Sequence, residues 1–418
     1  MSKKMLVIPG GFVPYNDTVT LLSYKHLRNL DCEMDVIALN GQVDEGIKQS
    51  LNQDINYKKF NIEYFGNYDE TVATYEKKNI VSGFFNLLKY CFYAKKKVKM
   101  KKYDFVYTSS IPSFTHFAGY LIKKMLKEDI IWIASFSDPL YKSPYKTDLE
   151  SFKEYNIIQK IGFFVYIGIY MNGFYEKIAQ KYADKIIYIC EEQKDFMISH
   201  YSNKDELDKK GMIIPLNYIK DWDIYKQLLI KSEVKNEKKI VAHFGRIYGL
   251  RKIDSVLVAL SELNKEIVNL EDKIVFEQYG QILDRYLNMI KDLKIENLFK
   301  CYDKISYKEV MEKMYSSDCL ALYDTFVQEG EIQPYLPSKS LEYLLLEKDL
   351  FILTPLKSPT HRIFESYGYN CVNNDVQSIK NRIKEILNND TVYMDYDISD
   401  LENEVATKPL SDYINLSR

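Results

Sequence analysis

The sequence has few of the residues from which metal centres and disulfide frameworks are built. It contains six cysteines and five histidines among 418 residues. No two cysteines have C-x-x-C spacing, the cysteines lie within apolar runs, and no pair of histidines has metal-ligand spacing. No D-x-D motif stands at the end of an expected strand. We therefore expect reduced, buried cysteines, a cytoplasmic location and no requirement for a metal.

Long apolar runs and a strong net charge are also missing. No run approaches the roughly 20 apolar residues that a membrane-spanning helix needs. The short stretch Met1–Lys4 leads directly into an expected strand, so we expect no signal peptide. The net charge is −2, which gives no indication of a nucleic-acid partner.

Short apolar runs recur along the chain and alternate with amphipathic stretches. Runs that are β-branched or aromatic and lack polar alternation are typical of strands buried on both faces of a parallel sheet. Helical spacing of apolar residues predicts helices over Thr18–Leu30, Ser113–Lys127 and Asp254–Leu263. The expected strands are Met5–Ile8, Asp35–Leu39, Asp104–Tyr107, Ile130–Ala134, Lys185–Ile189, Met212–Ile214, Lys239–His243, Lys273–Tyr279, Leu298–Tyr302, Cys319–Tyr323 and Leu350–Leu353.

This alternation predicts an α/β protein with two Rossmann-like, doubly wound lobes that face a central cleft. The alternation breaks once, in a polar, lysine-rich stretch between Tyr218 and Glu237. We therefore predict an N-terminal lobe over residues 1–218 and a C-terminal lobe over residues 219–394. The tail, from about 395 to 418, is free to pack back on the first lobe. Ligands of such sheets bind beyond the carboxyl ends of the strands.

The first candidate site is the turn that follows the expected strand Lys239–His243. Glycines at 245 and 249 allow a tight backbone turn, and a helix is expected directly after it. Arg246, Arg251 and Lys252 add three cations, so the turn could hold a diphosphate. The alternative is a solvated basic turn. The segment matches neither the P-loop nor the dinucleotide fingerprint.

The second candidate is the segment Leu336–Leu344, which follows a polar loop after the strand Cys319–Tyr323. Pro337 suits the first turn of a helix, Ser338 could cap it, and Lys339 could reach a phosphate. Glu342 could accept hydrogen bonds from two sugar hydroxyls. The alternative for Glu342 is an acidic side chain that merely favours the helix dipole.

With these motifs the C-terminal half resembles retaining glycosyltransferases of the GT-B fold, in particular the large family 4-like group. Its Pro-Ser-Lys-x-x-Glu segment is similar to the segment that opens the donor-site helix in that group. The resemblance implies a nucleotide diphosphate sugar as the donor substrate, no cofactor, and Glu342 on the ribose. It implies a diphosphate site made by residues of both candidate segments, namely Gly245, Arg246, Arg251, Lys252, Pro337, Ser338 and Lys339.

The sequence departs from the family pattern at two positions. Much of the family has a second glutamate seven residues before the one at 342, where this chain has Pro334. Many relatives have glycine where this chain has Ile253. The first departure leaves contact with the donor sugar in doubt, so the resemblance supports nucleotide binding more firmly than catalysis.

The N-terminal half carries a weaker resemblance. Gly10 and Gly11 resemble the family's glycine-rich loop on the acceptor side, although a tight turn would need glycine as well. Asp138 corresponds to the acidic member of a pair that faces the acceptor, with Ser137 in place of the family's histidine. We therefore take Asp138 as the candidate catalytic residue, and a turn-forming aspartate before proline as the alternative. His243 could border the cleft, but a satisfied histidine near the core is the more common outcome.

A cluster of six lysines lies between Lys95 and Lys102, directly after an aromatic stretch. Aromatic residues beside lysines suit an anionic membrane surface, so Phe84–Lys102 is a candidate contact with the inner face of the membrane. The alternative is a solvated helix end. Membrane contact would suit a lipid-linked saccharide as the acceptor.

The function predicted from the sequence is transfer of a hexosyl or N-acetylhexosaminyl group from a nucleotide diphosphate sugar to a saccharide hydroxyl. The resemblance implies retention at the anomeric carbon and a role in making cell-surface polysaccharide or glycoconjugate. A non-catalytic, GT-B-like binding or chaperone subunit is the first alternative. A nucleotide-sugar epimerase is the second alternative. It ranks below the first because epimerase chemistry needs a cluster of acid and base groups, and no convincing cluster is evident.

Overall fold

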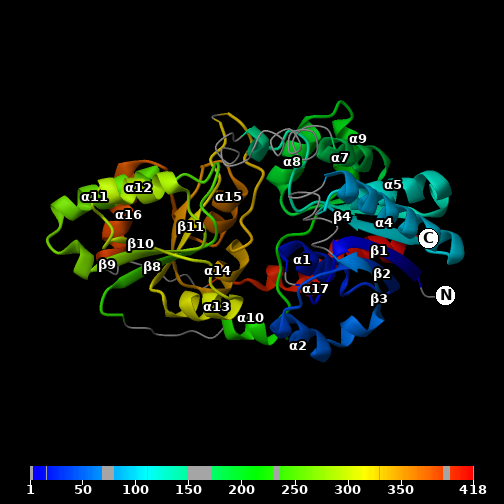
Figure 1. Ribbon diagram of the computed structural model, residues 1–418, viewed down its shortest axis with the longest axis horizontal. Coiled ribbons are helices and arrows are strands. Elements are labelled where there is room, and N and C mark those ends of the chain that lie inside the picture. Colours follow the sequence, from blue (N-terminus) through cyan, green and yellow to red (C-terminus); the bar gives the residue numbers. More distant parts are fainter. Residues whose placement is uncertain are drawn as a thin grey trace. The chain divides into compact units, whose positions relative to one another are not determined.

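The structure is a computed structural model that describes residues 3–15, 17–67, 80–110, 112–147, 171–228, 236–328, 330–388 and 396–417 (Figure 1). The chain forms two compact units. The first comprises Met1–Tyr225 together with Ser399–Arg418, and the second comprises Lys226–Ile398. Part of the polar stretch that we interpreted as the junction, residues 229–235, lies outside the described residues.

The first unit contains a parallel sheet that has seven strands over the described residues, in the order β3-β2-β1-β4-β5-β6-β7. The central strand β1 pairs on both sides, with Val7 opposite Val36 of β2 and Tyr107 of β4. The strands are β1 (Lys3–Gly11), β2 (Cys32–Asn40), β3 (Phe60–Asn67), β4 (Phe105–Ser109), β5 (Ile131–Ser135), β6 (Lys185–Tyr188) and β7 (Gly211–Ile213).

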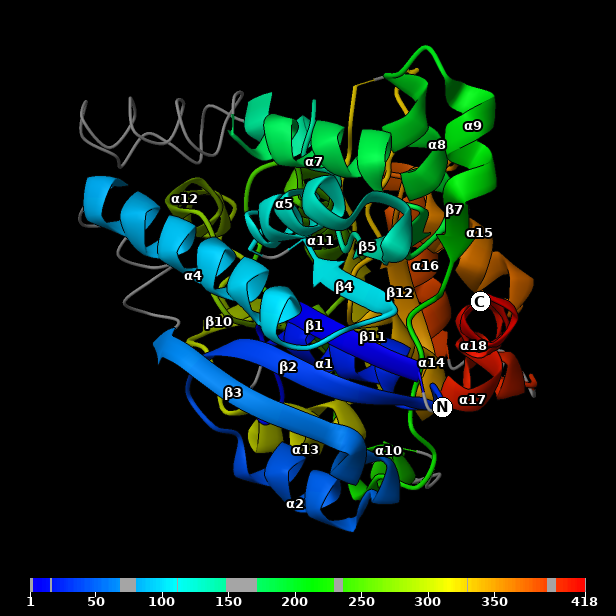
Figure 2. The same cartoon turned by 90° about the vertical axis from the view of Figure 1, so that its right-hand side faces the viewer.

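Helices cover both faces of this sheet, as the doubly wound pattern predicts. A single apolar cluster joins one face to α4, α5 and α7, which lie together over the strands in Figure 2. Tyr24 and His26 of α1 pack on the other face, where His26 meets Tyr107. The helices of the unit are α1 (Thr18–Leu27), α2 (Glu45–Gln53), α4 (Ile80–Met100), α5 (Thr115–Leu126), α7 (Met171–Tyr182), α8 (Glu191–Ser199), α9 (Lys204–Lys210), α10 (Asp223–Leu228, which runs across the boundary), α17 (Asn403–Ala406) and α18 (Lys408–Leu416).

The C-terminal tail belongs to the first unit. Asn403 in α17 is buried and donates to the carbonyl of Lys25 and to the side-chain oxygen of Asn217, at 2.8 Å in each case. Lys3 donates from its ammonium group to the carbonyls of Ile414 and Ser417 at 2.6 Å. These contacts attach both ends of the tail to the unit formed by the N-terminal half.

The second unit contains a parallel sheet that has six strands over the described residues, in the order β10-β9-β8-β11-β12-β13. In its register His243 of β8 lies opposite Gln278 of β9. The strands are β8 (Lys239–Phe244), β9 (Ile274–Tyr279), β10 (Phe299–Tyr302), β11 (Cys319–Tyr323), β12 (Asp349–Leu353) and β13 (Cys371–Val372).

One face of this sheet forms an apolar core with the helices that follow β8, β9 and β13 (Figure 1). Two of the helices of this unit begin with side-chain caps, because Ser306 and Glu309 form a capping box and Ser358 accepts from the amide of His361. The helices are α11 (Asp254–Glu266), α12 (Asp284–Asp292), α13 (Tyr307–Ser316), α14 (Ser340–Leu346), α15 (Pro359–Ser366) and α16 (Val376–Asn388).

The two doubly wound sheets confirm the predicted fold class, but the sequence prediction missed two strands. The strand β3 lies at one edge and is half exposed, and β13 has two residues, so neither forms a continuous apolar run. Helix α1 ends at Leu27 rather than Leu30, and the side chain of the next residue, Arg28, contacts Asp54. Local periodicity carries no information about such distant contacts.

Candidate functional site

The candidate residues of the second unit gather at the carboxyl edge of its sheet. The strands β8, β9, β11 and β12 are parallel, so the segments that follow them emerge at one edge. The backbone joins two of these segments directly. Phe326 donates its amide to the carbonyl of Leu250 at 3.0 Å, and Arg251 forms an antiparallel bridge with Thr325. The turn after β8 and the loop after β11 therefore form one surface.

The turn after β8 presents cations at this edge, as the sequence predicts. Arg246 and Lys252 are exposed, whereas Arg251 is half-buried and donates to the carbonyl of Arg246 at 3.0 Å. The Arg251 guanidinium lies 5.7 Å from the ring centre of Tyr248. Its Nε is buried and has no hydrogen-bond partner among the described residues. An anion at this turn would meet one oriented guanidinium and two exposed cations.

A buried polar pair under the turn sets the position of Gly245. Gln278 donates from its amide nitrogen to the carbonyl of Gly245 at 2.7 Å, so its oxygen faces Nδ1 of His243 at 2.6 Å. This arrangement requires a proton on Nδ1 of His243. Burial lowers the pKa of His243 to about 3, so the ring is neutral. His243 is thus a satisfied histidine near the core, and it supports the turn from below.

Gly280 is required where β9 passes this turn. Its φ is +121°, and a Cβ atom built there would lie 2.7 Å from the carbonyl oxygen of Gly245. Any side chain would push the two segments apart. Neither Gln278 nor Gly280 was predicted from the sequence as part of the site, although Gln278 is near the end of the expected strand Lys273–Tyr279 and Gly280 directly follows it.

A buried carboxylate anchors the loop after β11. Asp324 is fully buried and accepts from the amide of Thr325 at 2.6 Å, from Gln333 at 2.7 Å and from the hydroxyl of Thr354 at 2.7 Å. Burial raises the pKa of Asp324 to about 6, although these donors and the nearby charge of Arg251 favour the ionised form. Asp324 directly follows a predicted strand, but no local pattern in the sequence indicates that it is buried.

The Pro-Ser-Lys segment ends in a helix that begins later than predicted. Helix α14 starts at Ser340 and has Lys339 at its N-cap position, without a side-chain capping bond. Pro337 instead precedes the helix and accepts from the amide of Ser340 at 3.0 Å. The predicted placement of Pro337 in the first helical turn and of Ser338 as its cap was therefore wrong. A tight turn over residues 337–340 replaces it.

The two carboxylate oxygens of Glu342 differ in their surroundings. Its Oε1 lies 3.6 Å from Nζ of Lys339, and its side chain is 15% exposed. The other oxygen, Oε2, is buried without a hydrogen-bond partner among the described residues, as is the hydroxyl of Ser340. A buried carboxylate oxygen without a donor is costly. Donor groups of a ligand would satisfy it.

In the first unit, Gly10 and Gly11 are the last residues of β1 rather than a loop after it. Both are buried. Gly10 has a φ of +80°, and a Cβ atom built there would lie 2.2 Å from Cδ of Pro112. Close contact with Pro112 is therefore sufficient reason for glycine at this position, and a role toward an acceptor remains a prediction.

Asp138 lies in the turn that follows β5 and is half-buried. The turn is held on both sides. The amide of Ser137 donates to the hydroxyl of Ser110 at 3.0 Å, and the buried carboxylate of Glu176 accepts from the amides of Leu140 and Tyr141 at 2.8 Å each. Asp138 and the end of β1 share the carboxyl edge of the first sheet, with β4 between their strands.

The predicted membrane contact falls largely on helix α4. Two of the six lysines pair with carboxylates of the sheet, since Lys97 lies 2.5 Å from Glu63 and Lys101 lies 2.6 Å from Asp35. The solvent-facing stripe alternates aromatic and basic side chains: Phe85, Lys89, Phe92, Lys96 and Lys99. The side chain of Phe84 lies outside the described residues. Within the described part of the chain, no helix is long and apolar enough to cross a membrane.

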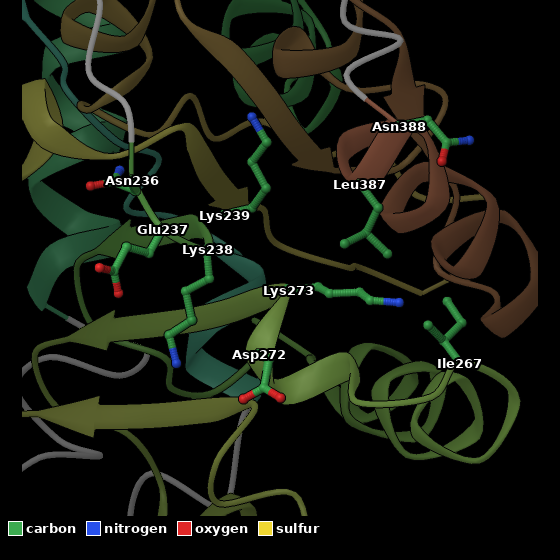
Figure 3. Close-up of a pocket in the computed structure, with 9 residues that line it drawn as sticks. All are labelled: Asn236, Glu237, Lys238, Lys239, Ile267, Asp272, Lys273, Leu387 and Asn388. Atoms are coloured by element: carbon green, nitrogen blue, oxygen red, sulfur yellow. The ribbon is translucent and has the colours of Figure 1, made fainter.

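A cavity of about 440 Å³ lies at the opposite, amino edge of the second sheet (Figure 3). It is lined by Asn236, Glu237, Lys238, Lys239, Ile267, Asp272, Lys273, Leu387 and Asn388. Figure 3 shows that its three lysines point in different directions, so their charges do not converge on one point. The cavity is therefore separate from the candidate site and has no built anion site.

The described residues contain no group of three or more histidine, cysteine, aspartate or glutamate side chains placed to hold a metal ion. The cysteines described form no disulfide bonds and are buried or half-buried. Burial raises the pKa of Cys91 well above its usual value, and that of Cys301 to about 11. These thiols are therefore protonated and behave as small core residues.

Comparison with known proteins adds fold information. No family model matches the sequence, and no curated protein matches it. The Anabaena protein Alr3699/HepE, solved in complex with UDP and glucose, is 13% identical with a TM-score of 0.60 over 100% of both chains. The lipopolysaccharide outer core galactosyltransferase WaaB is 11% identical, with a TM-score of 0.58 over 99% of both chains. A glycosyltransferase from Rickettsia africae is 14% identical, with a TM-score of 0.58 over 100% of this chain and 94% of that one.

These alignments run along the whole chain, so the likeness extends over both units and not over one Rossmann-like unit alone. Identities of 11–14% establish the fold alone. The protein therefore has the GT-B fold.

Proposed function

We propose that this protein is a glycosyltransferase that binds a nucleotide diphosphate sugar at the carboxyl edge of its second sheet. The observation that carries the proposal is the buried, unpartnered Oε2 of Glu342, at the same sheet edge as Arg251. A nucleotide offers both complements, because its ribose hydroxyls can donate to a carboxylate and its diphosphate accepts from a guanidinium. The solved complex of the Anabaena protein contains UDP and glucose, which supports the same ligand class.

In the proposed reaction, the bond between the anomeric carbon and the diphosphate oxygen breaks while an acceptor hydroxyl attacks that carbon. The hydroxyl passes its proton to the departing diphosphate oxygen, and the nucleoside diphosphate leaves with the bonding electrons. Arg246, Arg251, Lys252 and Lys339 would stabilise the charge that develops on the diphosphate. We assign Asp138 to the acceptor hydroxyl. We infer retention at the anomeric carbon, which the anomeric configuration of the product would test by NMR.

The proposed acceptor is a saccharide, lipid-linked or free, in the synthesis of cell-surface polysaccharide or glycoconjugate. We propose that the reaction takes place in the cytoplasm and needs no metal. One observation favours a second candidate, a binding subunit without catalysis. Buried Pro334 stands where the family has its sugar-contacting glutamate. Slow hydrolysis of a nucleotide sugar by the purified protein would exclude the second candidate.

A thermal-shift measurement tests the nucleotide proposal directly. We expect UDP, GDP or ADP, or one of their sugars, to raise the Tm, because a ligand that binds only the folded state stabilises it. At a ligand concentration of about 100 times Kd, the stabilisation is about 2.7 kcal/mol. The parent nucleosides, which lack the diphosphate, are the matched controls. An unchanged Tm with every nucleotide would contradict the proposal, and conversion of one nucleotide sugar into another without an acceptor would indicate an epimerase.

We further propose that α4 places the protein on the anionic inner face of a membrane. Phe85 and Phe92 on its outer stripe are 56% and 54% exposed, with lysines between and beyond them. Exposed aromatics insert at the headgroup level while lysines attract anionic lipids.

We expect the protein to co-sediment with phosphatidylglycerol vesicles, and the double variant Phe85→Ser/Phe92→Ser to lose most of this binding. Val268→Ser removes a more exposed apolar side chain, 79% exposed, from the second unit and is the control. Equal binding by the double variant and the control would show that α4 is a solvated helix.

A further inference from the structure

We propose that Asp324 is a positioning residue that holds the segment Gln333–Lys339 and the turn after β8 in the arrangement that receives the nucleotide. The inference rests on the proposed function, because it concerns the same site. Asp324 would not touch the ligand. It would act through its connections to three segments beneath the site: the Pro-Ser-Lys segment, the end of β12 and the turn after β8.

The first connection runs from Asp324 to the Pro-Ser-Lys segment. Oδ1 of Asp324 accepts from Nε2 of Gln333 at 2.7 Å, and the side-chain oxygen of Gln333 accepts from the amide of Tyr335 at 2.5 Å. Gln333 is fully buried, so its amide group has no water to replace these partners. This chain of bonds fixes the backbone just before Pro337 and thereby the approach to Lys339 and Glu342.

The second connection runs to the end of β12. Thr354 donates from its hydroxyl to Oδ2 of Asp324 at 2.7 Å, so the Ser358 hydroxyl, 2.7 Å away, must donate to Thr354. Ser358 in turn accepts from the amide of His361 and caps α15. The direction of these hydrogen bonds is set by the carboxylate, which can only accept when ionised.

The third connection runs to the cationic turn. The residues next to Asp324 pair with that turn, through the bridge of Thr325 to Arg251 and the bond from Phe326 to Leu250. Asp324 itself donates its amide to the carbonyl of Leu353 at 2.9 Å, which keeps β11 and β12 in register to their ends. Displacement of Asp324 would therefore move Arg251 as well as Gln333.

Asp324 places a carboxylate at a fully buried position. A fully buried aspartate is rare unless it has specific partners, and this one accepts from its neighbour Thr325 and from the distant side chains of Gln333 and Thr354. An apolar residue would fill the same space without desolvation of a charge. Unlike an apolar residue, the carboxylate of Asp324 can hold the segment Gln333–Lys339 in position through its hydrogen bonds.

The test compares Asp324→Ala and Asp324→Asn in the full chain with a control at the opposite end of β11. Asp318 precedes β11 at its other end and accepts from the amide of Ile240 at 2.9 Å and from Asn236 at 2.8 Å. Asp318→Ala thus removes a comparable anchor far from the site. Two quantities are measured: hydrogen exchange of the amides in Gln333–Lys339 without ligand, and the Kd for UDP by calorimetry.

For Asp324→Ala we expect faster exchange in Gln333–Lys339 and a Kd for UDP raised roughly tenfold or more. Asp324→Asn keeps an acceptor for Gln333 and should restore most of both properties. Asp318→Ala should change neither. If Asp324→Ala does not fold, Gln333→Ala removes one of the same bonds and should raise exchange and Kd in the same direction.

Unchanged exchange in a folded Asp324→Ala variant, or the same changes in Asp318→Ala, would overturn the inference. Failure of the proposed function can be distinguished from failure of this inference. If the proposed function is wrong, the unmodified chain binds no nucleotide, but hydrogen exchange in the Asp324 variants still tests whether Asp324 holds the segment Gln333–Lys339. A rise in Kd without faster exchange would also overturn the inference, since it would indicate direct contact with the ligand.

Discussion

Replacement of Glu342 by alanine is expected to raise the Kd for the nucleoside diphosphate by roughly 100-fold. Hydrogen bonds to a charged group contribute about 1.5–3 kcal/mol each, and every 1.4 kcal/mol is about tenfold in affinity. Loss of the hydrogen bonds from two ribose hydroxyls to one carboxylate therefore accounts for a roughly 100-fold rise in Kd, once the entropic cost of ordering the ligand is subtracted. Calorimetry with the nucleotide that gives the largest thermal shift measures it.

The same variant is expected not to lose stability, although it loses affinity for the nucleotide. Oε2 of Glu342 is buried without a partner in the ligand-free protein, and its neighbour Lys339 lies 3.6 Å from the other oxygen. Removal of a buried, unsatisfied oxygen relieves a desolvation cost. We therefore expect the Tm of ligand-free Glu342→Ala to be no lower than that of the unmodified protein, although its affinity is lower.

Two further variants control for indirect effects. Glu342→Gln keeps one acceptor oxygen and should fall between alanine and the native residue. Glu347→Gln changes a glutamate at the other end of the same short helix and should leave nucleotide affinity unchanged. If Glu342→Ala bound the nucleotide with native affinity, the assignment of the ribose to this carboxylate would be wrong.

The largest loss of stability is expected from Asp54→Ala in the first unit. Asp54 accepts from Nε of Arg28 at 2.6 Å, from the hydroxyl of Tyr24 at 2.8 Å and from the indole of Trp222 at 3.1 Å. The side chains of Arg28 and Asp54 are 6% and 1% exposed. Loss of one partner of a buried ion pair costs about 3–5 kcal/mol, because the other charge stays buried.

Tryptophan fluorescence in a urea titration measures the unfolding of the first unit separately from that of the second. Both tryptophans of the chain, Trp132 and Trp222, belong to the first unit, so their signal follows its unfolding rather than that of the second unit. Glu404→Ala is the matched control. Glu404 is the other partner of Arg28, but its side chain is 54% exposed, so we expect a loss below about 1 kcal/mol.

The contribution of Asp54 should depend on pH in a defined direction. Burial alone raises the pKa of Asp54, but the bonds from Arg28 and Tyr24 outweigh it and hold the pKa below its usual value. A carboxyl group with a depressed pKa in the folded state stabilises the protein above its unfolded pKa of about 3.9. The difference between native protein and Asp54→Ala should therefore shrink as the pH falls below about 4. An equal difference at pH 3 and pH 7 would contradict this account.

Much of the fold follows from local patterns in the sequence. Buried parallel strands consist of continuous apolar runs, and this explains why β8, β11 and β12 were predicted close to their observed bounds. Strands at the sheet edges are less apolar or very short, and β3 and β13 were missed for that reason. Helix ends were less accurate, as at α1, which ends at Leu27 rather than Leu30.

The same division applies to the candidate site. The rule that ligands bind beyond the carboxyl ends of parallel strands is enough to group Arg251, Lys339 and Glu342 from the sequence alone. It cannot show that Oε2 of Glu342 is buried without a donor, because that depends on everything packed around it. Nor can it show that Gly10 is explained by Pro112, about 100 residues away in the chain.

By itself, then, the sequence determined the two doubly wound sheets and predicted the sheet edge for the candidate site, because apolar periodicity and chain order are local properties. The tertiary structure decided which polar groups at that edge are satisfied. Asp324 has partners at 333 and 354, and Gly245 is supported from 278. Hydrogen-bond satisfaction depends on residues brought together only by folding, so no window of the sequence contains it.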